Sequence, residues 1–330
     1  MVQKGFKKMK KIIALLLTLL MVTAFTACDT TPAEDDGKYV VGICQLTQHV
    51  ALDAATKGFM DALTEEFGDN VTFELKNANN DQNACPTIIA NLVSADVDLI
   101  MANATPALTA AVNGTDTIPV LGTSITEYGT ALEIDNFNGL VGGNVSGTSD
   151  LAPLDQQADM LVDLFPEAKT VAMLYCSAEA NSDYQVKKVT EYLTAKGLTC
   201  VNYAFTDSND VSIVAKNAAD NADVIYIPTD NTAADCTETI NNVIGDTPVI
   251  AGEEGICSGC GVATLCISYY DLGVKTGKMA AKILKGEADI SEMEIEYVET
   301  FTKKYNKAKC EQLNIDTAAL EAKGYTAIEN

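Results

Sequence analysis

Arginine and tryptophan are absent from these 330 residues, and histidine occurs once, as His49. Without arginine, the chain has no bidentate guanidinium clamp for a carboxylate or a phosphate. An anionic ligand group would therefore be held by backbone N–H groups, hydroxyls or a lysine. The sequence also lacks a serine nucleophile elbow, a phosphate-cradling glycine-rich loop and an obvious triad for the lone histidine. We therefore predict a protein that is not an enzyme and has no catalytic residues.

Positive charge is scarce as well. Twenty-two lysines stand against 46 aspartate and glutamate residues, which gives a net charge of −24. This charge argues against a nucleic-acid partner and against an electrostatic grip on anionic lipid. After residue 28, no apolar run approaches the ~20 residues of a membrane-spanning helix.

The N-terminus carries a secretory signal. Five lysines precede an apolar run over 12–22, which is followed by Phe25-Thr26-Ala27-Cys28. A basic start, a short apolar stretch and a small-residue cleavage site indicate a signal peptide over 1–27. The ending on Cys28 resembles a bacterial lipobox, which predicts an acylated Cys28, a polar tether over 28–38 and lipid anchoring on the extracytoplasmic face of the cell membrane. An ordinary signal peptide cut nearby is the alternative.

Nine cysteines follow Cys28, and an odd number cannot all pair within the chain. Most lie in apolar surroundings, which favours small buried hydrophobes. Cys257-Ser258-Gly259-Cys260 is the one sharp spacing, typical of a redox pair or half of a metal site. A zinc site would need further ligands, and His49 is distant in sequence. We therefore predict no metal and no cofactor.

From residue 39 onward, strand and helix patterns alternate in two successive passes. The first pass has expected strands at 39–46, 71–75, 98–102 and 118–121 and expected helices at 50–67, 87–93 and 106–112. The second has expected strands at 170–175, 198–205, 224–227 and 248–251 and expected helices at 182–196, 211–219 and 232–243. Local sequence repeats too, because Asn103-Ala104-Thr105-Pro106-Ala107 parallels Thr229-Asp230-Asn231-Thr232-Ala233. Such alternation predicts parallel sheets covered by helices on both faces.

The duplication predicts an α/β fold of two Rossmann-like, doubly wound parallel-sheet lobes joined by a hinge. We expect the N-terminal lobe to comprise 39–148 plus about 270–292. The C-terminal lobe should comprise 149–269 plus about 293–330. A helix over 272–284 is expected to return to the first lobe, and a last strand over 294–301 is expected to cross between the lobes.

In open α/β sheets, ligands bind beyond the carboxyl ends of the strands, so the loops there are the candidate site. First-lobe loops are rich in hydroxyls beside helix N-termini, which suit a carboxylate. Second-lobe loops are rich in acids, which suit an ammonium group, and the two together predict a zwitterion site. The predicted ligand-binding residues are Gln45, His49, Thr105, Thr123, Ser124, Glu179, Asn181, Asp230, Asn231 and Glu253. Helix capping is the alternative for each of the loop hydroxyls, amides and acids, and a structural role is the alternative for His49.

Five ordered motifs carry a resemblance that spans about 39–297. They are Val41-Gly42-Ile43-Cys44-Gln45 with His49, Gly147-Thr148-Ser149-Asp150, Ser177-Ala178-Glu179-Ala180-Asn181-Ser182, Pro228-Thr229-Asp230-Asn231 and Tyr269-Tyr270-Asp271-Leu272-Gly273. The chain resembles the tryptophan/tyrosine-type substrate-binding lipoproteins of bacterial ABC importers. That resemblance implies a type I periplasmic-binding-protein fold that closes over an aromatic amino acid and delivers it to an ABC permease. Gln48 and Cys257-Ser258-Gly259-Cys260 depart from the family pattern and bear on which amino acid is bound.

We therefore predict a monomeric, lipid-anchored receptor that captures an amino acid, most simply Trp, Tyr or Phe, for import. A surface receptor for a sugar, nucleoside or signalling molecule is the second hypothesis, since the same fold serves those ligands. A thiol oxidoreductase using Cys257 and Cys260 is the third.

Overall fold

The computed structural model describes residues 37–328. The predicted signal peptide, Cys28 and all of the tether before Gly37 lie outside the described residues. The chain divides after Lys38, and the unit from Tyr39 to Asn330 contains both predicted lobes.

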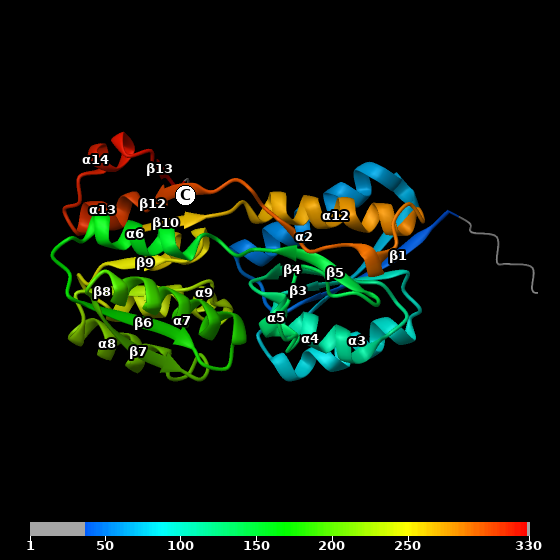
Figure 1. Ribbon diagram of the computed structural model, residues 1–330, viewed down its shortest axis with the longest axis horizontal. Coiled ribbons are helices and arrows are strands. Elements are labelled where there is room, and N and C mark those ends of the chain that lie inside the picture. The colour runs from blue at the N-terminus through cyan, green and yellow to red at the C-terminus, as the bar shows by residue number, and fades with distance from the viewer. Residues whose placement is uncertain (1–36, 329–330) are drawn as a thin grey trace, which may run out of the picture. The chain divides into compact units, whose positions relative to one another are not determined.

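The first lobe is built on a six-stranded parallel sheet with the order β11-β5-β4-β3-β1-β2. Its first strands and helices are β1 (Tyr39–Gln45), α2 (Val50–Phe67), β2 (Val71–Asn77), α3 (Cys85–Ser94), β3 (Leu99–Asn103), α4 (Thr105–Gly114), β4 (Val120–Ile125), α5 (Tyr128–Ala131) and β5 (Val145–Ser149). Strands β3, β4 and β5 are buried along their whole length, as expected where helices cover both faces of a sheet. One apolar cluster lies under α3 and α4 and another under α2 (Figure 1).

The second lobe has a seven-stranded sheet with the order β13-β12-β10-β9-β8-β6-β7. Its elements are α6 (Leu154–Leu164), β6 (Thr170–Cys176), α7 (Ala180–Ala195), β7 (Thr199–Phe205), α8 (Val211–Asn221), β8 (Val224–Ile227), α9 (Asn231–Asp235), α10 (Thr237–Val243), β9 (Val249–Ala251), α11 (Glu254–Cys260), β10 (Ala263–Cys266), β12 (Thr302–Tyr305), α13 (Lys307–Gln312), α14 (Thr317–Ala322) and β13 (Thr326–Ala327). Strand β12 runs antiparallel to β10, whereas the other described pairings are parallel.

The chain passes between the lobes at three places, after β5, after β10 and before β12. The second passage leads into α12 (Tyr269–Leu284), which lies along α2 in the first lobe (Figure 1). Glycines permit this approach, because a Cβ on Gly273 would lie 1.9 Å from the Ala55 carbonyl oxygen and one on Gly58 would lie 2.1 Å from that of Tyr270. The helix therefore returns to the first lobe, as the sequence suggested.

One expected boundary needs correction. The sequence places the segment from about 293 onward in the second lobe, but β11 (Glu296–Tyr297) pairs with β5 at the edge of the first sheet. Only after β11 does the chain cross to the second sheet, where β12 pairs with β10. The strand is only two residues long, and so short a segment has no periodicity that would show which sheet it joins.

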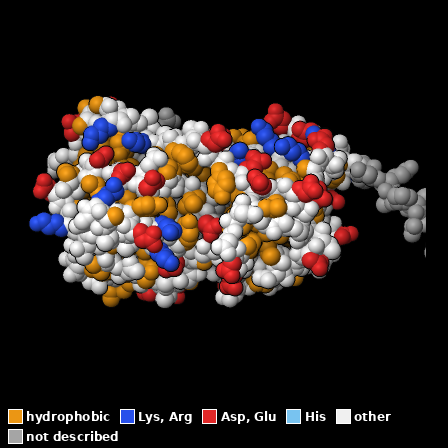
Figure 2. Space-filling model, viewed as in Figure 1, with side chains coloured by type: hydrophobic (Ala, Val, Ile, Leu, Met, Phe, Trp, Pro, Cys, Tyr) orange, Lys and Arg blue, Asp and Glu red, His pale blue; other side chains and the backbone are white. Residues whose placement is uncertain are grey.

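Acidic side chains are spread over both lobes on the face shown in Figure 2. No described helix is both long and apolar enough to cross a membrane.

Candidate functional site

A small cavity lies where the loops of the two lobes meet. It is lined by His49, Leu52, Ser124, Thr126, Asp150, Asn181, Thr229, Asp230, Asn231, Ala234, Glu253 and Tyr269. Most of these residues follow the carboxyl end of a strand, where an open α/β sheet binds its ligands. The cavity encloses about 10 Å³, roughly the room that one water molecule needs, so the two lobes are closed on each other.

Hydrogen bonds between side chains hold the lobes in this arrangement. Four of them join first-lobe to second-lobe side chains: Thr47 Oγ1 to Asp235 Oδ2 at 2.7 Å, His49 Nε2 to Asn231 Oδ1 at 3.2 Å, Asn80 Nδ2 to Thr232 Oγ1 at 3.3 Å, and Gln185 Nε2 to Thr126 Oγ1 at 3.3 Å. Each is a single polar contact between a first-lobe loop residue and a residue of α7 or α9, and a few such contacts, each contributing on the order of 1 kcal/mol, are compatible with reversible opening.

Four polar atoms that face this cavity have no hydrogen-bond partner, although they are buried. They are His49 Nδ1, Ser124 Oγ, Asp150 Oδ1 and Asn181 Oδ1. An unpaired buried polar group costs about 1–3 kcal/mol, so native structures rarely keep several together without a reason. Ser124 adds backbone strain, because its φ of 56° lies in the left-handed region. Orphaned acceptors and donors concentrated in one cavity are what a polar ligand would satisfy.

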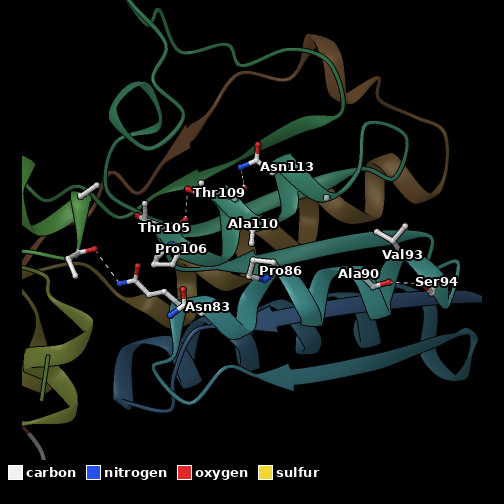
Figure 3. Close-up of a pocket in the computed structure, with 14 residues that line it drawn as sticks. Asn83, Pro86, Ala90, Val93, Ser94, Thr105, Pro106, Thr109, Ala110 and Asn113 are labelled. Carbon is white, nitrogen blue, oxygen red and sulfur yellow. Dashed lines mark hydrogen bonds between the residues drawn. The ribbon is translucent and has the colours of Figure 1, made fainter. Parts of the chain in front are cut away.

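A larger cavity lies along the first lobe and reaches the second lobe at Ala178 and Ala180. It is a groove of about 700 Å³ between α3 and α4, with Pro86, Ala90 and Ala110 among its walls (Figure 3). Several of its hydroxyls and amides are paired, as when Thr109 Oγ1 donates to the Thr105 carbonyl at 3.1 Å. None of the described side chains lining this groove has a buried polar atom without a partner. The interlobe cavity is therefore the better candidate for a polar ligand.

Four predicted site residues do not line the interlobe cavity: Glu179 lies beside it, and the other three lie elsewhere. Thr105 lies in the groove between α3 and α4. Gln45 is tied inside the first lobe, where its Nε2 donates to the Thr47 carbonyl at 2.7 Å and its Oε1 accepts from Thr56 at 2.6 Å. Thr123 is enclosed beneath α12, 3.1 Å from the Thr276 hydroxyl.

The other six predicted residues line the cavity, but the second-lobe acids have partners of their own. Asp230 is the N-cap of α9, where Oδ1 accepts from Ala233 N at 2.8 Å and Oδ2 from Cys176 N at 2.7 Å. Burial and the nearby Glu179 raise the pKa of Asp230. The capping alternative is the one that this geometry favours for Asp230.

Glu179 and Glu253 hold loops in the same way. Glu179 accepts from the backbone N–H groups of Asn231 at 3.0 Å and Thr232 at 2.9 Å, and it also receives their side-chain donors. Glu179 lies beside the cavity rather than among its lining residues, and it orients Asn231 and Asn181 there. Glu253 is the N-cap of α11 and accepts from Gly255 N at 2.6 Å and from Ile256 N. Burial raises the pKa of Glu253.

Asp150 and Tyr269 line the cavity and are not among the residues predicted for the site. Asp150 ends the first repeat directly after β5, and Tyr269 begins α12 after the second crossing. The Tyr269 hydroxyl donates to Asp150 Oδ2 at 2.8 Å. Burial raises the pKa of Asp150 to about 6, against the lowering effects of the Tyr269 hydroxyl and of the nearby Thr126 hydroxyl. Both residues lie in motifs that carry the family resemblance, and this resemblance is the sequence signal that could have identified them. The sequence places those two segments at the boundaries between the lobes instead of at the site.

The cysteine pair has no thiolate character. Cys257 and Cys260 are free and buried, and the Cys260 thiol donates to the Ile256 carbonyl at 3.5 Å. Burial raises the pKa of both thiols, that of Cys260 to about 12, whereas thiol–disulfide chemistry requires a thiolate. Among residues 37–328, no group of three or more His, Cys, Asp and Glu side chains is arranged to hold a metal ion.

Comparison with known proteins assigns the chain to a family. Residues 40–321 match the family described as ABC transporter substrate binding protein. The chain belongs to this family. It is 33% identical over 297 residues to a tyrosine-binding protein of Clostridioides difficile (strain R20291), an alignment that covers 85% of this chain and 86% of that relative. The family comprises binding proteins rather than enzymes, and the predicted membership is confirmed.

Two solved structures support the same assignment. An ABC domain from Streptococcus pneumonia in complex with L-Trp has a TM-score of 0.83 and 31% identity, covering 88% of this chain and 100% of that one. The ligand-free, open structure of a substrate binding protein with adhesive properties from Clostridium difficile has a TM-score of 0.67 and 33% identity, covering 88% and 99%. The predicted α/β fold of two parallel-sheet lobes, of the type I periplasmic-binding kind, is confirmed.

Proposed function

We propose that this substrate-binding protein captures an aromatic amino acid between its two lobes and delivers it to an ABC permease. The observation that carries the proposal is the set of unpaired donors and acceptors in the closed cavity: Ser124 Oγ, His49 Nδ1, Asn181 Oδ1 and Asp150 Oδ1. A zwitterion needs a hydroxyl or N–H donor for its carboxylate and an acceptor for its ammonium group. Relatives named for tyrosine binding and solved with L-Trp support an aromatic side chain.

The individual roles follow from chemistry and position. Ser124 near the end of β4 and Thr126 directly after it supply hydroxyls for the carboxylate, since the chain has no arginine. Asn181 and Asn231 offer amides from the second lobe, and His49 lies against the ligand's side chain. The apolar lining is provided by Leu52, Ala234 and the ring of Tyr269.

Closure is the step that a permease would sense. The chain matches the L-Trp complex better than the open structure, with TM-scores of 0.83 and 0.67, although the two sequence identities are nearly equal. This difference supports a closed arrangement of the lobes. Ligand can drive closure only through a higher affinity for the closed state, and pairing of the four orphaned atoms supplies that difference.

A thermal-shift screen of the domain from residue 29 onward against the twenty amino acids tests the proposal. Tyrosine, tryptophan or phenylalanine should give the largest shift, because ligand at 100 times its dissociation constant adds about 2.7 kcal/mol. Glucose, a nucleoside and leucine serve as controls. A shift with the sugar or nucleoside and none with any amino acid would replace the proposal with the second hypothesis.

We also propose that Cys28 is acylated and that the protein works at the extracytoplasmic face of the membrane. The support is the lipobox-like ending of the leader. Cys28→Ala should leave the fold intact and move the processed protein from the membrane fraction to the soluble fraction. Retention in the membrane fraction after processing would refute a lipid anchor.

A further inference from the structure

We propose that Asp150 is the acceptor of the ligand's ammonium group, which it binds through Oδ1 at the hinge between the lobes. The inference rests on the proposed function and assigns one of its two charge contacts. The acids of the second-lobe loops, from which the sequence predicted this contact, then have a different task.

The two oxygens of Asp150 differ. Oδ2 accepts from the Tyr269 hydroxyl at 2.8 Å, whereas Oδ1 has no partner, although the residue is only 4% exposed. The backbone fixes this orientation, because Asp150 N donates to the Ile125 carbonyl at 3.0 Å and so holds the residue beside the end of β4. One carboxylate oxygen is thereby anchored and the other is left to face the cavity.

No other acid at the cavity offers such an oxygen. Both oxygens of Asp230 accept backbone N–H groups, one from Ala233 in α9 and one from Cys176 at the end of β6, and both oxygens of Glu253 accept N–H groups that begin α11. Binding an ammonium group there would compete with a helix cap. The carboxylate of Glu179 is enclosed by four donors from Asn231 and Thr232.

The charge balance points the same way. No lysine lines the cavity, and His49 is its one basic side chain. A buried carboxylate without a cation is costly, and a ligand ammonium group would remove that cost while gaining a charge-assisted hydrogen bond. The neutral alternatives in the lining, hydroxyls and amides, cannot supply a negative charge.

The position of Asp150 also links binding to closure. Asp150 begins the crossing from β5 to α6, and Tyr269 follows the crossing from β10. Their hydrogen bond joins two of the three passages between the lobes. Tyr269 is thus a positioning residue, which orients the carboxylate without contacting the ammonium group.

The test compares Asp150→Asn with the parent by calorimetry, using L-tyrosine and its des-amino analogue, 3-(4-hydroxyphenyl)propionate, and the matching tryptophan pair. The variant should lose on the order of a hundredfold or more in affinity for the amino acids, because a buried charge pair is broken, and should bind the des-amino analogues within about threefold of the parent. Equal losses for both ligands, or an amino-acid affinity within threefold of the parent, would overturn the inference.

The matched control is Asp223→Asn. This exposed acid accepts the backbone N–H groups of Lys169 and Thr170 at 2.8 Å, and it lies at the end of the second sheet away from the cavity. It should leave both affinities unchanged. Tyr269→Phe should weaken amino-acid binding by a smaller factor, with the preference for the amino acid over its analogue retained.

A second measurement does not depend on how the variant folds. In the parent, the preference for L-tyrosine over its des-amino analogue should fall as pH is lowered from 7.5 to 5, as Asp150 gains a proton. Tyr269, Glu253, Tyr128 and His49 face the same region, so the titration is repeated in His49→Gln, where the fall must persist. A preference independent of pH would count against Asp150. A parent that binds no amino acid would refute the proposed function itself, whereas retained binding in Asp150→Asn would refute only this assignment.

Discussion

The two lobes use their polar loop residues differently. In the second lobe, Glu179, Asp230 and Glu253 direct their oxygens at backbone N–H groups of their own lobe. On the side of the first lobe and the hinge, Ser124 and Asp150 keep atoms without partners. The second lobe therefore uses its acids to build the shape of the site, and three of the four unpaired cavity atoms, all except Asn181 Oδ1, belong to the first lobe and the hinge.

Glu179→Ala should have the largest effect on stability. Removing the carboxylate leaves the buried N–H groups of Asn231 and Thr232 without acceptors, at about 1–3 kcal/mol each. We expect urea unfolding to show a loss of about 2–6 kcal/mol. Glu127→Ala, which removes the half-buried N-cap of α5, should cost about 1 kcal/mol. Equal losses in the two variants would mean that Glu179 is not a structural acid.

The pH dependence of stability should separate Asp150 from the rest. Its pKa is raised from 3.8 to about 6, so the folded state favours the protonated form. Its stabilising contribution is full below about pH 4 and is lost as pH rises through 6, about 3 kcal/mol in total. Relative to Asp150→Asn, the ligand-free parent should therefore lose stability between pH 4 and 7. Denaturant titrations of both proteins at several pH values check this. The neighbouring titratable residues Tyr269, Glu253, Tyr128 and His49 are present in both proteins, so their contributions largely cancel in the difference. If the free energy of unfolding of the two proteins changed with pH in parallel, the pKa of Asp150 would not be raised in the folded state.

Asp230→Asn tests the cap directly. An asparagine keeps one acceptor for Ala233 N but turns an amide donor toward Cys176 N. We expect a stability loss of about 1–2 kcal/mol and an affinity loss at least tenfold smaller than that of Asp150→Asn. Calorimetry and urea unfolding of the same samples give both values. A binding loss as large as that of Asp150→Asn would place the ammonium group on the second lobe.

Ser124→Gly should have the smallest effects, and it should change stability and ligand affinity in opposite directions. Glycine adopts the φ of 56° without strain, so the variant should be more stable by up to about 1 kcal/mol. It also loses the hydroxyl proposed for the carboxylate, which should weaken binding by about tenfold. Thermal unfolding measures the expected gain in stability, and calorimetry measures the expected loss of affinity. A variant with unchanged affinity would remove Ser124 from the site.

The duplicated fold could be predicted because its signals are local and repeated. Apolar runs such as β1 and β6, each followed by a helix pattern, appear in both halves of the chain. The lobe of β11 could not be predicted correctly, because its partner β5 is distant in sequence and its own two residues carry no periodicity. The capping roles of Asp230 and Glu253 were open alternatives, and only the positions of the N–H groups decide between cap and ligand contact.

The site could be predicted as a set of loops but not atom by atom. Thr123 and Ser124 are neighbours, yet one is enclosed among threonines and the other faces the cavity, because the backbone turns into a left-handed conformation at Ser124. Asp150 depends on a tyrosine 119 positions away to anchor one of its oxygens. The contacts of Tyr269 with Asp150 and of Thr276 with Thr123 depend on how α12 packs on the first lobe, and no local sequence pattern predicts that packing.

A crystal structure of the protein with L-tyrosine or L-tryptophan tests the central claim most directly. The account predicts the ligand nitrogen within about 3 Å of Asp150 Oδ1, with Asp230 and Glu253 still capping α9 and α11 as they do now. A ligand nitrogen bound instead by Glu179, Asp230 or Glu253, with those backbone hydrogen bonds broken, would contradict it.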